Sequence, residues 1–431
     1  MKLKTLTTAM ILATVPMTGA FAAALDRSGQ SISAFLQPGN YFEAGISVLD
    51  PNVSGKVRNG YTPNAALPAS SAGLQNTSVG EMAGDYYFPS AALKLQVTDN
   101  FSFGLIYDQP FGAEAEYSTG TQKTTALPGP LAPLGNQGAF HNGTEGTSVE
   151  VKSQSISMLF GYQPTENFNF YAGPVYQTIK GDVQLRGLAY GGNATFGGYN
   201  ASIKETGDIG WLAGAAFQIP DIALKASVTY RSEIEHSVNV KESFNSAGLF
   251  AGLNAAPSLN TDITTPQSVN LDFQTGIMAN TVAFANVRWV DWSSFSIQPY
   301  KFGLASKNAT VQAQTGKSEF DLVAYTDDQI SATVGVGRKL NDQWAGNVSV
   351  GWDSGAGNPV TTLGPTEGYW NVGLGAQFSP TPQTFIAGGV KYFWLGDAKA
   401  QSAAQFNTAN YVADFESNYA IAYGLKMGYK F

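Results

Sequence analysis

The chain lacks cysteine altogether and has few charged residues and only two histidines among its 431 residues. Without cysteine there is no disulfide framework, no thiolate catalysis and no cysteine-based zinc site. Charged residues make up 13% of the chain, against an average of about 25% in soluble proteins. The formal net charge of −8 argues against a nucleic-acid partner, because phosphate binding needs a basic surface.

Long apolar runs are also missing. Lys2 and Lys4 precede an apolar run at residues 9–15 and a small-residue stretch at residues 20–24, which is the pattern of a secretory signal peptide. We therefore predict a signal peptide over residues 1–22 and export of the mature chain. No later stretch holds eighteen consecutive apolar residues, so any membrane crossing must use strands. Only a closed barrel can do this, because lipid offers no hydrogen-bond partner to an open sheet edge.

The chain does have strict alternation, most clearly in its last fourteen residues. One parity of this segment is apolar: Tyr419, Ile421, Tyr423, Leu425, Met427, Tyr429 and Phe431. Because successive side chains of a strand point to opposite faces, the segment has one apolar face with aromatic residues at both ends. That is typical of a strand covered by lipid; the alternative is a half-buried strand of a soluble β-domain. The terminal Phe431 resembles the assembly signal of bacterial outer-membrane barrels, which predicts the barrel-assembly machinery as a partner.

The same alternation predicts fourteen strands. They lie at residues 41–50, 86–97, 101–108, 149–163, 167–185, 207–219, 222–240, 266–279, 281–294, 324–339, 343–353, 368–379, 383–395 and 418–431. The gaps between them are alternately tight and long, as in outer-membrane barrels with short periplasmic turns and longer extracellular loops. We therefore predict an all-β, monomeric, fourteen-stranded antiparallel barrel over residues 41–431 in the bacterial outer membrane. Residues 23–40 would form a short N-terminal plug.

Several phrases resemble the FadL/TodX family of outer-membrane channels for hydrophobic compounds. They are the first strand running into the turn Asp50-Pro51-Asn52, the phrase Thr229-Tyr230-Arg231-Ser232-Glu233, and Pro266-Gln267-Ser268-Val269 followed by Arg288-Trp289-Val290-Asp291-Trp292. The resemblance implies a barrel plugged by an N-terminal hatch, with a kinked third strand that opens the wall sideways. The expected opening is at Asp108, Gln109, Pro110, Phe111 and Gly112. The chain departs from the family in its hatch, which is shorter.

The resemblance implies passive uptake of hydrophobic molecules, with long-chain fatty acids as the expected substrate. A carboxylate head needs an inward cation, because unpaired burial of charge is costly; the candidates are Arg231, Arg288, Lys180, Arg186 and Lys301. Apolar loop residues could line an extracellular groove or pack on one another as loop caps: Leu249, Phe250, Leu253, Leu131, Leu134 and Phe140. A polar-solute porin and a structural or adhesive barrel are the competing functions.

The sequence gives little indication of an enzyme. Catalysis at the membrane belt would need a Ser–His pair. The nearest approach is Ser232 with His236, which we expect to share the lipid-facing parity of Tyr230, and no residue is evident that would orient the imidazole. Neither a phosphate-binding loop nor a metal-ligand cluster is evident, so we predict no cofactor and no metal. Besides the hydrophobic ligand, the expected partners are the lipid and lipopolysaccharide of the outer membrane.

Overall fold

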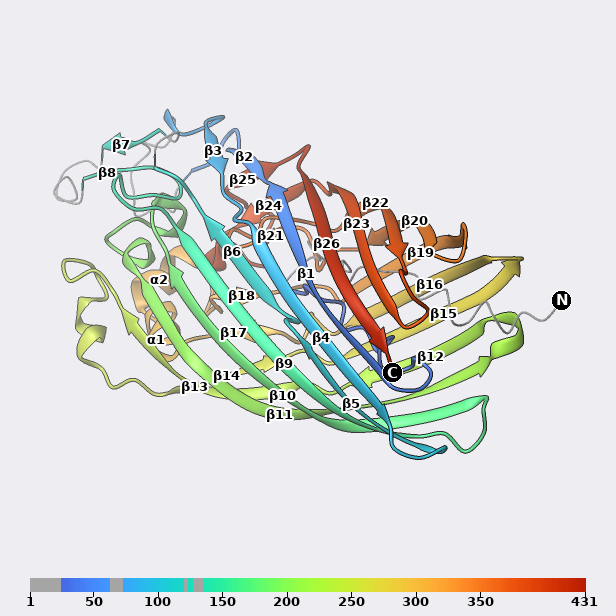
Figure 1. The fold of residues 1–431 in the computed structure, drawn as a ribbon. Coiled ribbons are helices and arrows are strands. Elements are labelled where there is room, and N and C mark those ends of the chain that lie inside the picture. Colours follow the sequence, from blue (N-terminus) through green and yellow to red (C-terminus); the bar gives the residue numbers. More distant parts are fainter. Residues whose placement is uncertain (1–24, 63–72, 120–122, 127–134) are drawn as a thin grey trace.

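The chain folds into a closed antiparallel barrel of fourteen strands, as predicted (Figure 1). The structure is a computed structural model that describes residues 25–62, 73–119, 123–126 and 135–431. Three of the fourteen strands are each split in two by a break, so the barrel sheet contains seventeen segments. The barrel closes where the first strand pairs with the last, from Tyr41 opposite Lys430 to Asn52 opposite Tyr419.

The segments of the wall follow chain order. They are β1 (Tyr41–Asn52), β4 (Tyr86–Gln96), β5 (Phe101–Asp108) with β6 (Gly112–Glu116), β9 (Ser148–Tyr162), β10 (Phe168–Gln184), β11 (Asn200–Ile219), β12 (Leu224–Arg231) with β13 (Ile234–Ser243), β14 (Asn260–Thr265) with β15 (Ser268–Met278), β16 (Thr281–Val290), β19 (Gln329–Lys339), β20 (Trp344–Asp353), β22 (Tyr369–Phe378), β23 (Thr384–Leu395) and β26 (Tyr419–Lys430). Tight turns join the strands at one end, which we call the turn end. The opposite end is the loop end.

Smaller elements build the loop end. They are the two-to-four-residue strands β2 (Ser54–Val57), β3 (Ser78–Glu81), β7 (Thr125–Ala126), β8 (Asn136–Gln137), β17 (Ser296–Ile297), β18 (Val323–Ala324), β21 (Val360–Thr361), β24 (Ala398–Gln401) and β25 (Ala413–Phe415), and the helices α1 (Tyr300–Ser306) and α2 (Ala309–Thr315). Within the described ranges, no helix has the length and apolar character needed to span a membrane.

The largest differences from the predicted strand boundaries all lie at the loop end. The third strand resumes after residue 108 as β6 and ends at Glu116, and the ninth ends at Val290 rather than 294. The sixth strand begins at Asn200 rather than 207, and the eighth at Asn260 rather than 266. Residues 323–324 belong to a separate small strand, so the tenth wall strand begins at Gln329 rather than 324. A register shift beside Ile179 and Gly181 and a break after Thr265 interrupt the alternation. These extensions contain many polar residues, so no lipid contact imposes an apolar parity on them.

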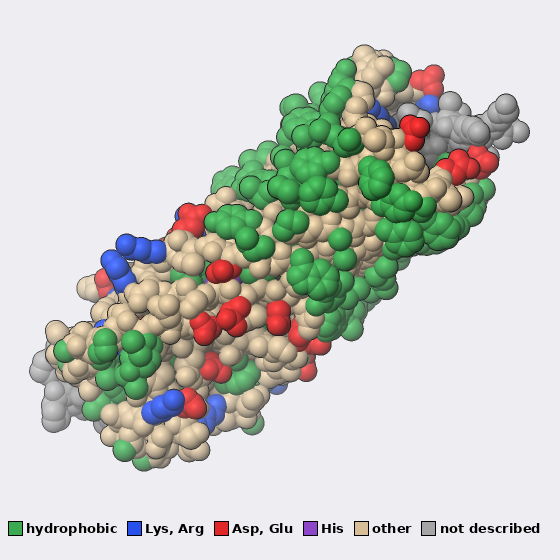
Figure 2. Space-filling view, turned by 90° about the horizontal axis from the view of Figure 1, so that it is seen from below, with side chains coloured by type: hydrophobic (Ala, Val, Ile, Leu, Met, Phe, Trp, Pro, Cys, Tyr) green, Lys and Arg blue, Asp and Glu red, His purple; other side chains and the backbone are tan. Residues whose placement is uncertain are grey.

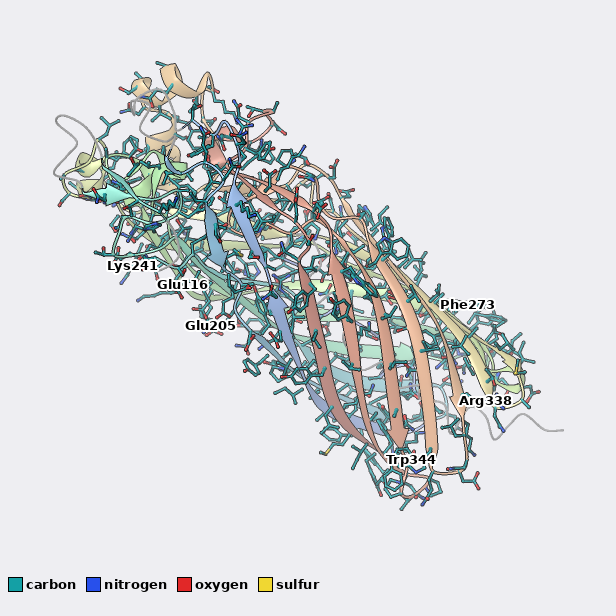
Figure 3. The ribbon with its side chains drawn as sticks, turned by 90° about the horizontal axis from the view of Figure 1, so that it is seen from above. Glu116, Glu205, Lys241, Phe273, Arg338 and Trp344 are labelled. Atoms are coloured by element: carbon teal, nitrogen blue, oxygen red, sulfur yellow. The ribbon has the colours of Figure 1, made fainter. Side chains whose placement is uncertain are left out.

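The predicted parity of the terminal strand is confirmed. Tyr423, Leu425 and Met427 are 49–57% exposed on the outer face, whereas Ala420 and Ala422 on the other parity are 0–1% exposed. Figure 2 shows hydrophobic side chains gathered around the turn-end half of the barrel, with charged side chains on the half toward the loops. The labelled Phe273, Arg338 and Trp344 lie toward the turn end in Figure 3, and Glu116, Glu205 and Lys241 toward the loop end. The apolar band therefore covers one half of a long barrel.

Residues 25–40, which we call the N-terminal segment, lie in the barrel interior. Phe35 packs edge-on against Tyr171 of β10, with ring centres 5.7 Å apart. Lys94 and Lys225, on the inner faces of β4 and β12, donate hydrogen bonds to the carbonyls of Gln37 and Leu36. The dark-blue trace in Figure 1 follows this path into the barrel near the C-terminus. The predicted signal peptide, residues 1–22, lies outside the described residues.

Candidate ligand site in the barrel lumen

The wall is interrupted between β4 and the third strand. Pairing of β4 with β5 runs from Gln96 opposite Ser102 to Ala91 opposite Tyr107, and there it stops. The remaining residues of β4, Tyr86–Ser90, pair with β1 alone among the described strands. After Asp108 the third strand resumes as β6, which pairs with β9. A gap therefore separates residues 86–90 from residues 108–112, and we call it the wall gap.

The N-terminal segment occupies the open edge of the third strand at the wall gap. Arg27 N donates to Pro110 O over 2.7 Å, and Gly112 N donates to Leu25 O over 2.8 Å. These bonds place Asp26 opposite Phe111 as an antiparallel bridge. An unpaired strand edge is costly inside a membrane, so the segment satisfies groups that β4 leaves free.

A buried ion pair anchors this segment to the far wall. Arg288 Nε of β16 donates to Asp26 Oδ2 over 2.7 Å. The same guanidinium reaches Gln30 Oε1 at 3.0 Å and Asn270 Oδ1 at 2.7 Å. Both members of the pair are at most 2% exposed. Because a buried carboxylate needs its partner, Arg288 fixes the position of the segment in the lumen.

On the loop side of the segment lies a cavity of about 70 Å³, which we call the apolar chamber. Its walls carry inward aliphatic and aromatic side chains, and residues of the loops close it from above. The lining includes Val53, Met82, Tyr86, Val149, Val151, Val183, Ile203, Leu322, Tyr325 and Leu363, with Leu25 and Arg27 of the N-terminal segment. Such a lining suits a hydrophobic ligand, which apolar surface binds without directional contacts.

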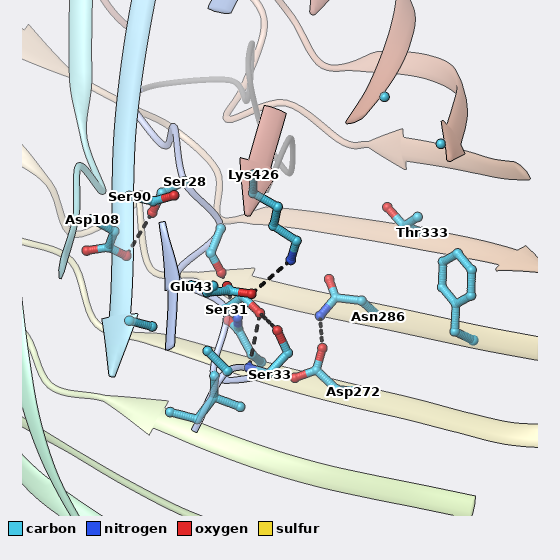
Figure 4. Close-up of a pocket in the computed structure, with 18 of the residues that line it drawn as sticks. Ser28, Ser31, Ser33, Glu43, Ser90, Asp108, Asp272, Asn286, Thr333 and Lys426 are labelled. Carbon is cyan, nitrogen blue, oxygen red and sulfur yellow. Dashed lines mark hydrogen bonds and ion pairs between the residues drawn. The ribbon is translucent and has the colours of Figure 1, made fainter. Parts of the chain in front are cut away.

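On the turn side lies a larger cavity of about 230 Å³, which we call the polar cavity. Ser28, Ser31 and Ser33 of the N-terminal segment face Glu43, Asp272 and Lys426 of the wall across it (Figure 4). Lys426 Nζ pairs with Glu43 Oε2 at 3.1 Å, and Asn286 Nδ2 donates to Asp272 Oδ1 at 2.8 Å. The N-terminal segment thus separates an apolar compartment from a polar one.

Arg27 lines both compartments. It is 7% exposed; its Nη1 donates to Asp26 O, and its guanidinium carbon lies 5.0 Å from the ring centre of Tyr86. Among the described residues Nε has no hydrogen-bond partner and no carboxylate forms an ion pair with the side chain. A buried cation without a counter-charge is unfavourable, so an anionic group at this junction would be stabilised.

The five predicted cations lie in different surroundings. Arg231 and Arg288 lie in the barrel interior, where Arg231 donates to Gln30 O at 3.0 Å and Ser157 Oγ at 3.3 Å. The inward orientation predicted for Lys180 was wrong, because Tyr171 and Val175 take the interior parity of β10 and leave Lys180 exposed. Arg186 and Lys301 lie at the loop end. A ligand contact for any of them stays a prediction.

The side chains of Arg186 and Lys301 are both bound by other protein groups at the loop end. Arg186 Nε pairs with Glu145 Oε2 at 2.8 Å, and Lys301 Nζ donates to Asn254 O at 3.3 Å. Neither residue lines the apolar chamber or the polar cavity. Arg27 was missed because it precedes the first strand, where no parity indicates which way a side chain points.

The apolar loop residues lie mainly inside a packed cap. Phe140 and Phe250 are at most 2% exposed; Phe140 stacks on Tyr117 at 4.3 Å, and Phe250 packs against Phe196 at 4.9 Å. These two residues do not line an open groove, because the loops bury them against one another. Leu253 packs against the same core, and Leu249 is 49% exposed. Leu131 and Leu134 lie outside the described residues.

The structure corrects the orientation predicted for one of the two histidines. His236 was expected to share the lipid-facing parity of Tyr230, but it is 0% exposed and points inward. The break at Ser232 and Glu233, between β12 and β13, reverses the parity. His236 Nε2 lies 3.1 Å from Gln177 Oε1. Burial lowers the pKa of His141, whose Nδ1 accepts a hydrogen bond from Gly143 N.

The predicted opening, Asp108 to Gly112, is the stretch that faces the wall gap. Asp108 Oδ2 accepts a hydrogen bond from Ser28 Oγ at 3.1 Å, and Phe111 packs edge-on against Trp292 at 5.5 Å. Pro110 and Gly112 pair with the N-terminal segment as described above, and Gln109 lines the polar cavity. Passage of a ligand through this place remains a prediction, as does the assembly role of Phe431, which is 54% exposed at the turn end.

Comparison with known proteins places the chain in a family. The sequence profile described as outer membrane protein transport protein (OMPP1/FadL/TodX) matches residues 135–431. No curated protein matches the chain by sequence. A FadL homologue from Pseudomonas aeruginosa has a similar fold, with a TM-score of 0.64 and 16% identity, over 93% of this chain and 92% of that one. The Pseudomonas putida toluene transporter TodX gives a TM-score of 0.56 with 12% identity, over 92% of this chain and 91% of that one.

The fold and the profile agree. The profile covers more than half of the chain, and the similar structures cover nearly all of it. Their low identity makes them similar in fold alone. The chain belongs to the OMPP1/FadL/TodX family of outer-membrane channels for hydrophobic compounds.

Proposed function

We propose that this channel takes up hydrophobic small molecules passively and releases them sideways through the wall gap. The observation that carries the proposal is the position of the apolar chamber. Its floor is the stretch Leu25–Arg27, and the same stretch covers the open edge of the third strand at Pro110 and Gly112. Only the stretch Leu25–Arg27 therefore separates a ligand in the chamber from the wall gap.

The route needs no energy source. A ligand enters from the loop end, which is extracellular in barrels with short periplasmic turns. It partitions into the apolar chamber because transfer of apolar surface from water to an apolar environment is favourable. Displacement of Leu25–Arg27 from the third strand would then open a passage between β4 and β6 into the membrane. The short N-terminal segment acts as the hatch, held by Asp26 and Arg288.

We further propose that the substrates are amphiphiles with a carboxylate head, such as long-chain fatty acids. Arg27 supports this class, because it is the cation at the chamber floor and forms no ion pair among the described residues, although Glu114 also lines the chamber. A guanidinium can hold both oxygens of a carboxylate, while the tail stays among Val149, Val151 and Val183. A neutral monoaromatic compound is the second candidate, since TodX is described as a toluene transporter.

Both the transport proposal and the proposed substrate class can be tested by uptake. Cells that express the chain are given labelled oleate or labelled toluene, with vector-only cells as the control. In the variant Arg27→Gln we expect weaker binding of oleate by about 1.5–3 kcal/mol, the range for a hydrogen bond to a charged group. Toluene uptake should be unchanged, and Arg27→Lys should restore part of the oleate binding. An equal loss of oleate and toluene uptake in Arg27→Gln would indicate that Arg27 has a structural role instead. If wild-type cells take up neither compound, the transport proposal itself fails.

A further inference from the structure

The outer surface of the barrel carries a row of like charges across three neighbouring strands. Lys152 of β9 lies directly opposite Lys180 of β10. Beside Lys180 the register between β10 and β11 shifts, and this irregularity turns both Lys204 and Glu205 of β11 to the outside. We call Lys152, Lys180 and Lys204 the lysine row; all three are exposed.

The lysine row destabilises the sheet when nothing neutralises its charge. Like charges directly opposite each other on neighbouring strands destabilise a sheet, and Lys152 and Lys180 form such a pair. A second like-charged row lies one step nearer the loops, where Glu150 is opposite both Glu114 and Asp182. Lys152 contacts Glu150 across the two rows. This contact leaves Lys180 and Lys204 without a salt bridge among the described residues.

The height of the lysine row on the barrel is defined by the apolar band. Toward the loops, the last large apolar residue on the outer face is Ile156 on β9 and Tyr176 on β10, which are 47% and 48% exposed. Both lysines lie four residues beyond these positions, a rise of about 10 Å for strands tilted 35–45°. Trp211, 52% exposed on β11, lies on the same outer face. Figure 2 shows charged side chains beyond the apolar band on the side toward the loops.

We propose that the lysine row binds the phosphate groups of lipopolysaccharide in the outer leaflet. The row stands at the level of the head groups, on the extracellular side of the apolar band. Lysine side chains can extend along the wall so that their ammonium groups approach the membrane surface. The acidic row lies on the loop side of the lysines, so the phosphates must approach from the membrane side. That direction matches a lipid head group and disfavours an ion from bulk water.

One acidic group within the row opposes the lipid. Glu205 lies on the membrane side, where its Oε1 accepts a hydrogen bond from Thr178 Oγ1 at 3.1 Å. Removing its charge should strengthen binding, whereas removing the lysines should weaken it. Opposite effects from neighbouring residues on one surface would not arise from a general loss of folding. They therefore separate a binding surface from a solvated face.

The test uses the mature protein refolded in detergent free of lipopolysaccharide and then titrated with it. Heat modifiability gives the temperature at which the folded form is lost on a gel. The readout is the lipid concentration that produces half of the maximal shift in this temperature. The combined variant Lys152→Gln, Lys180→Gln and Lys204→Gln should need more lipid, by about fivefold for each lysine removed. Glu205→Gln should need less. The matched control changes the exposed lysines Lys56, Lys123 and Lys399 to Gln and should behave as wild type.

Two further arms identify the source of the phosphate. Dephosphorylated lipopolysaccharide should give no shift, and inorganic phosphate at the same concentration should not compete. An unchanged midpoint in the lysine variant, or an equal loss in the control variant, would overturn the proposal. So would full competition by inorganic phosphate. If the combined variant does not fold, Lys180→Gln alone and Glu205→Gln must still shift the midpoint in opposite directions.

Discussion

The anchor of the N-terminal segment gives the sharpest mutational prediction. Replacing Arg288 by Gln removes the charge that faces Asp26, together with hydrogen bonds to Gln30 and Asn270. Asp26 would then be a carboxylate with 1% exposure and no cation. Breaking a buried pair in this way costs about 3–5 kcal/mol. Since 1.4 kcal/mol is a factor of ten, the attached state of the segment should lose a factor of about one hundred to several thousand.

Each of the remaining contacts is individually weaker than this loss. Asn270 Nδ2 donates to Gly29 O and Arg231 Nη2 to Gln30 O, and each bond of this kind contributes about 1 kcal/mol net. We therefore expect the segment to leave the lumen for part of the time while the barrel stays folded. The pairing of wall strands does not depend on Asp26, so heat modifiability should be retained.

Single-channel conductance and limited proteolysis measure this release. In Arg288→Gln the conductance should rise, and protease should cut the N-terminal segment faster than in wild type. The matched control is Arg338→Gln, an exposed arginine of β19 near the turn end (Figure 3), which should change neither. Wild-type conductance together with wild-type proteolysis in Arg288→Gln would refute the idea that this ion pair holds the hatch.

Three other changes have defined outcomes. Burial, with Asp353 nearby, raises the pKa of Glu367 in the loop before β22 to about 7. Because the folded state holds this proton more tightly, stability is lost as pH rises from the ordinary pKa of the carboxyl through 7. Glu367→Gln should therefore increase the free energy of unfolding at pH 8 by at most about 3 kcal/mol, seen as a higher unfolding temperature, and have little effect at pH 5. Arg231→Ala should weaken retention of oleate and of an alkane alike, because Arg231 holds Gln30 O; a loss confined to oleate would instead indicate direct contact. Deleting Phe431 should reduce heat-modifiable protein in outer membranes, and normal assembly would contradict its role as a signal.

The barrel could be predicted from sequence because lipid imposes a strict rule on each strand. Where lipid covers the wall, as along Tyr423, Leu425 and Met427, one parity must be apolar, and the pattern is unbroken. Above the apolar band this constraint ends, so the starts of β11 and β14 were misplaced. The break between β12 and β13 was not visible in the alternation, and it reversed the parity predicted for His236.

The candidate site was less predictable because it depends on contacts between distant parts of the chain. The apolar chamber forms where residues 25–27 meet strands β6 and β9–β11 and the loops around Tyr325 and Leu363. No local pattern indicates that Leu25 would pair with Gly112 or that Arg27 would lie at its floor. Parity did indicate that Arg231 and Arg288 point inward. It could not show that both hold the N-terminal segment.

The most direct test of the account is a removable tether across the wall gap. Asp26 and Phe111 are directly opposite each other without mutual hydrogen bonds, a geometry in which Cα atoms are about 4.5 Å apart and a disulfide fits. The chain has no cysteine of its own, so the double variant Asp26→Cys and Phe111→Cys carries a single possible bridge. The control pair is Ala83→Cys and Ala115→Cys, which also lie opposite each other but leave the N-terminal segment free.

Uptake of labelled oleate is measured in each double variant before and after reduction. Comparing the two states of one protein cancels the effect of losing the Asp26 carboxylate. The account predicts that the oxidised Asp26–Phe111 tether blocks uptake, that reduction restores it, and that the control pair transports in both states. Uptake that is equal in the oxidised and reduced tether would contradict release through the wall gap.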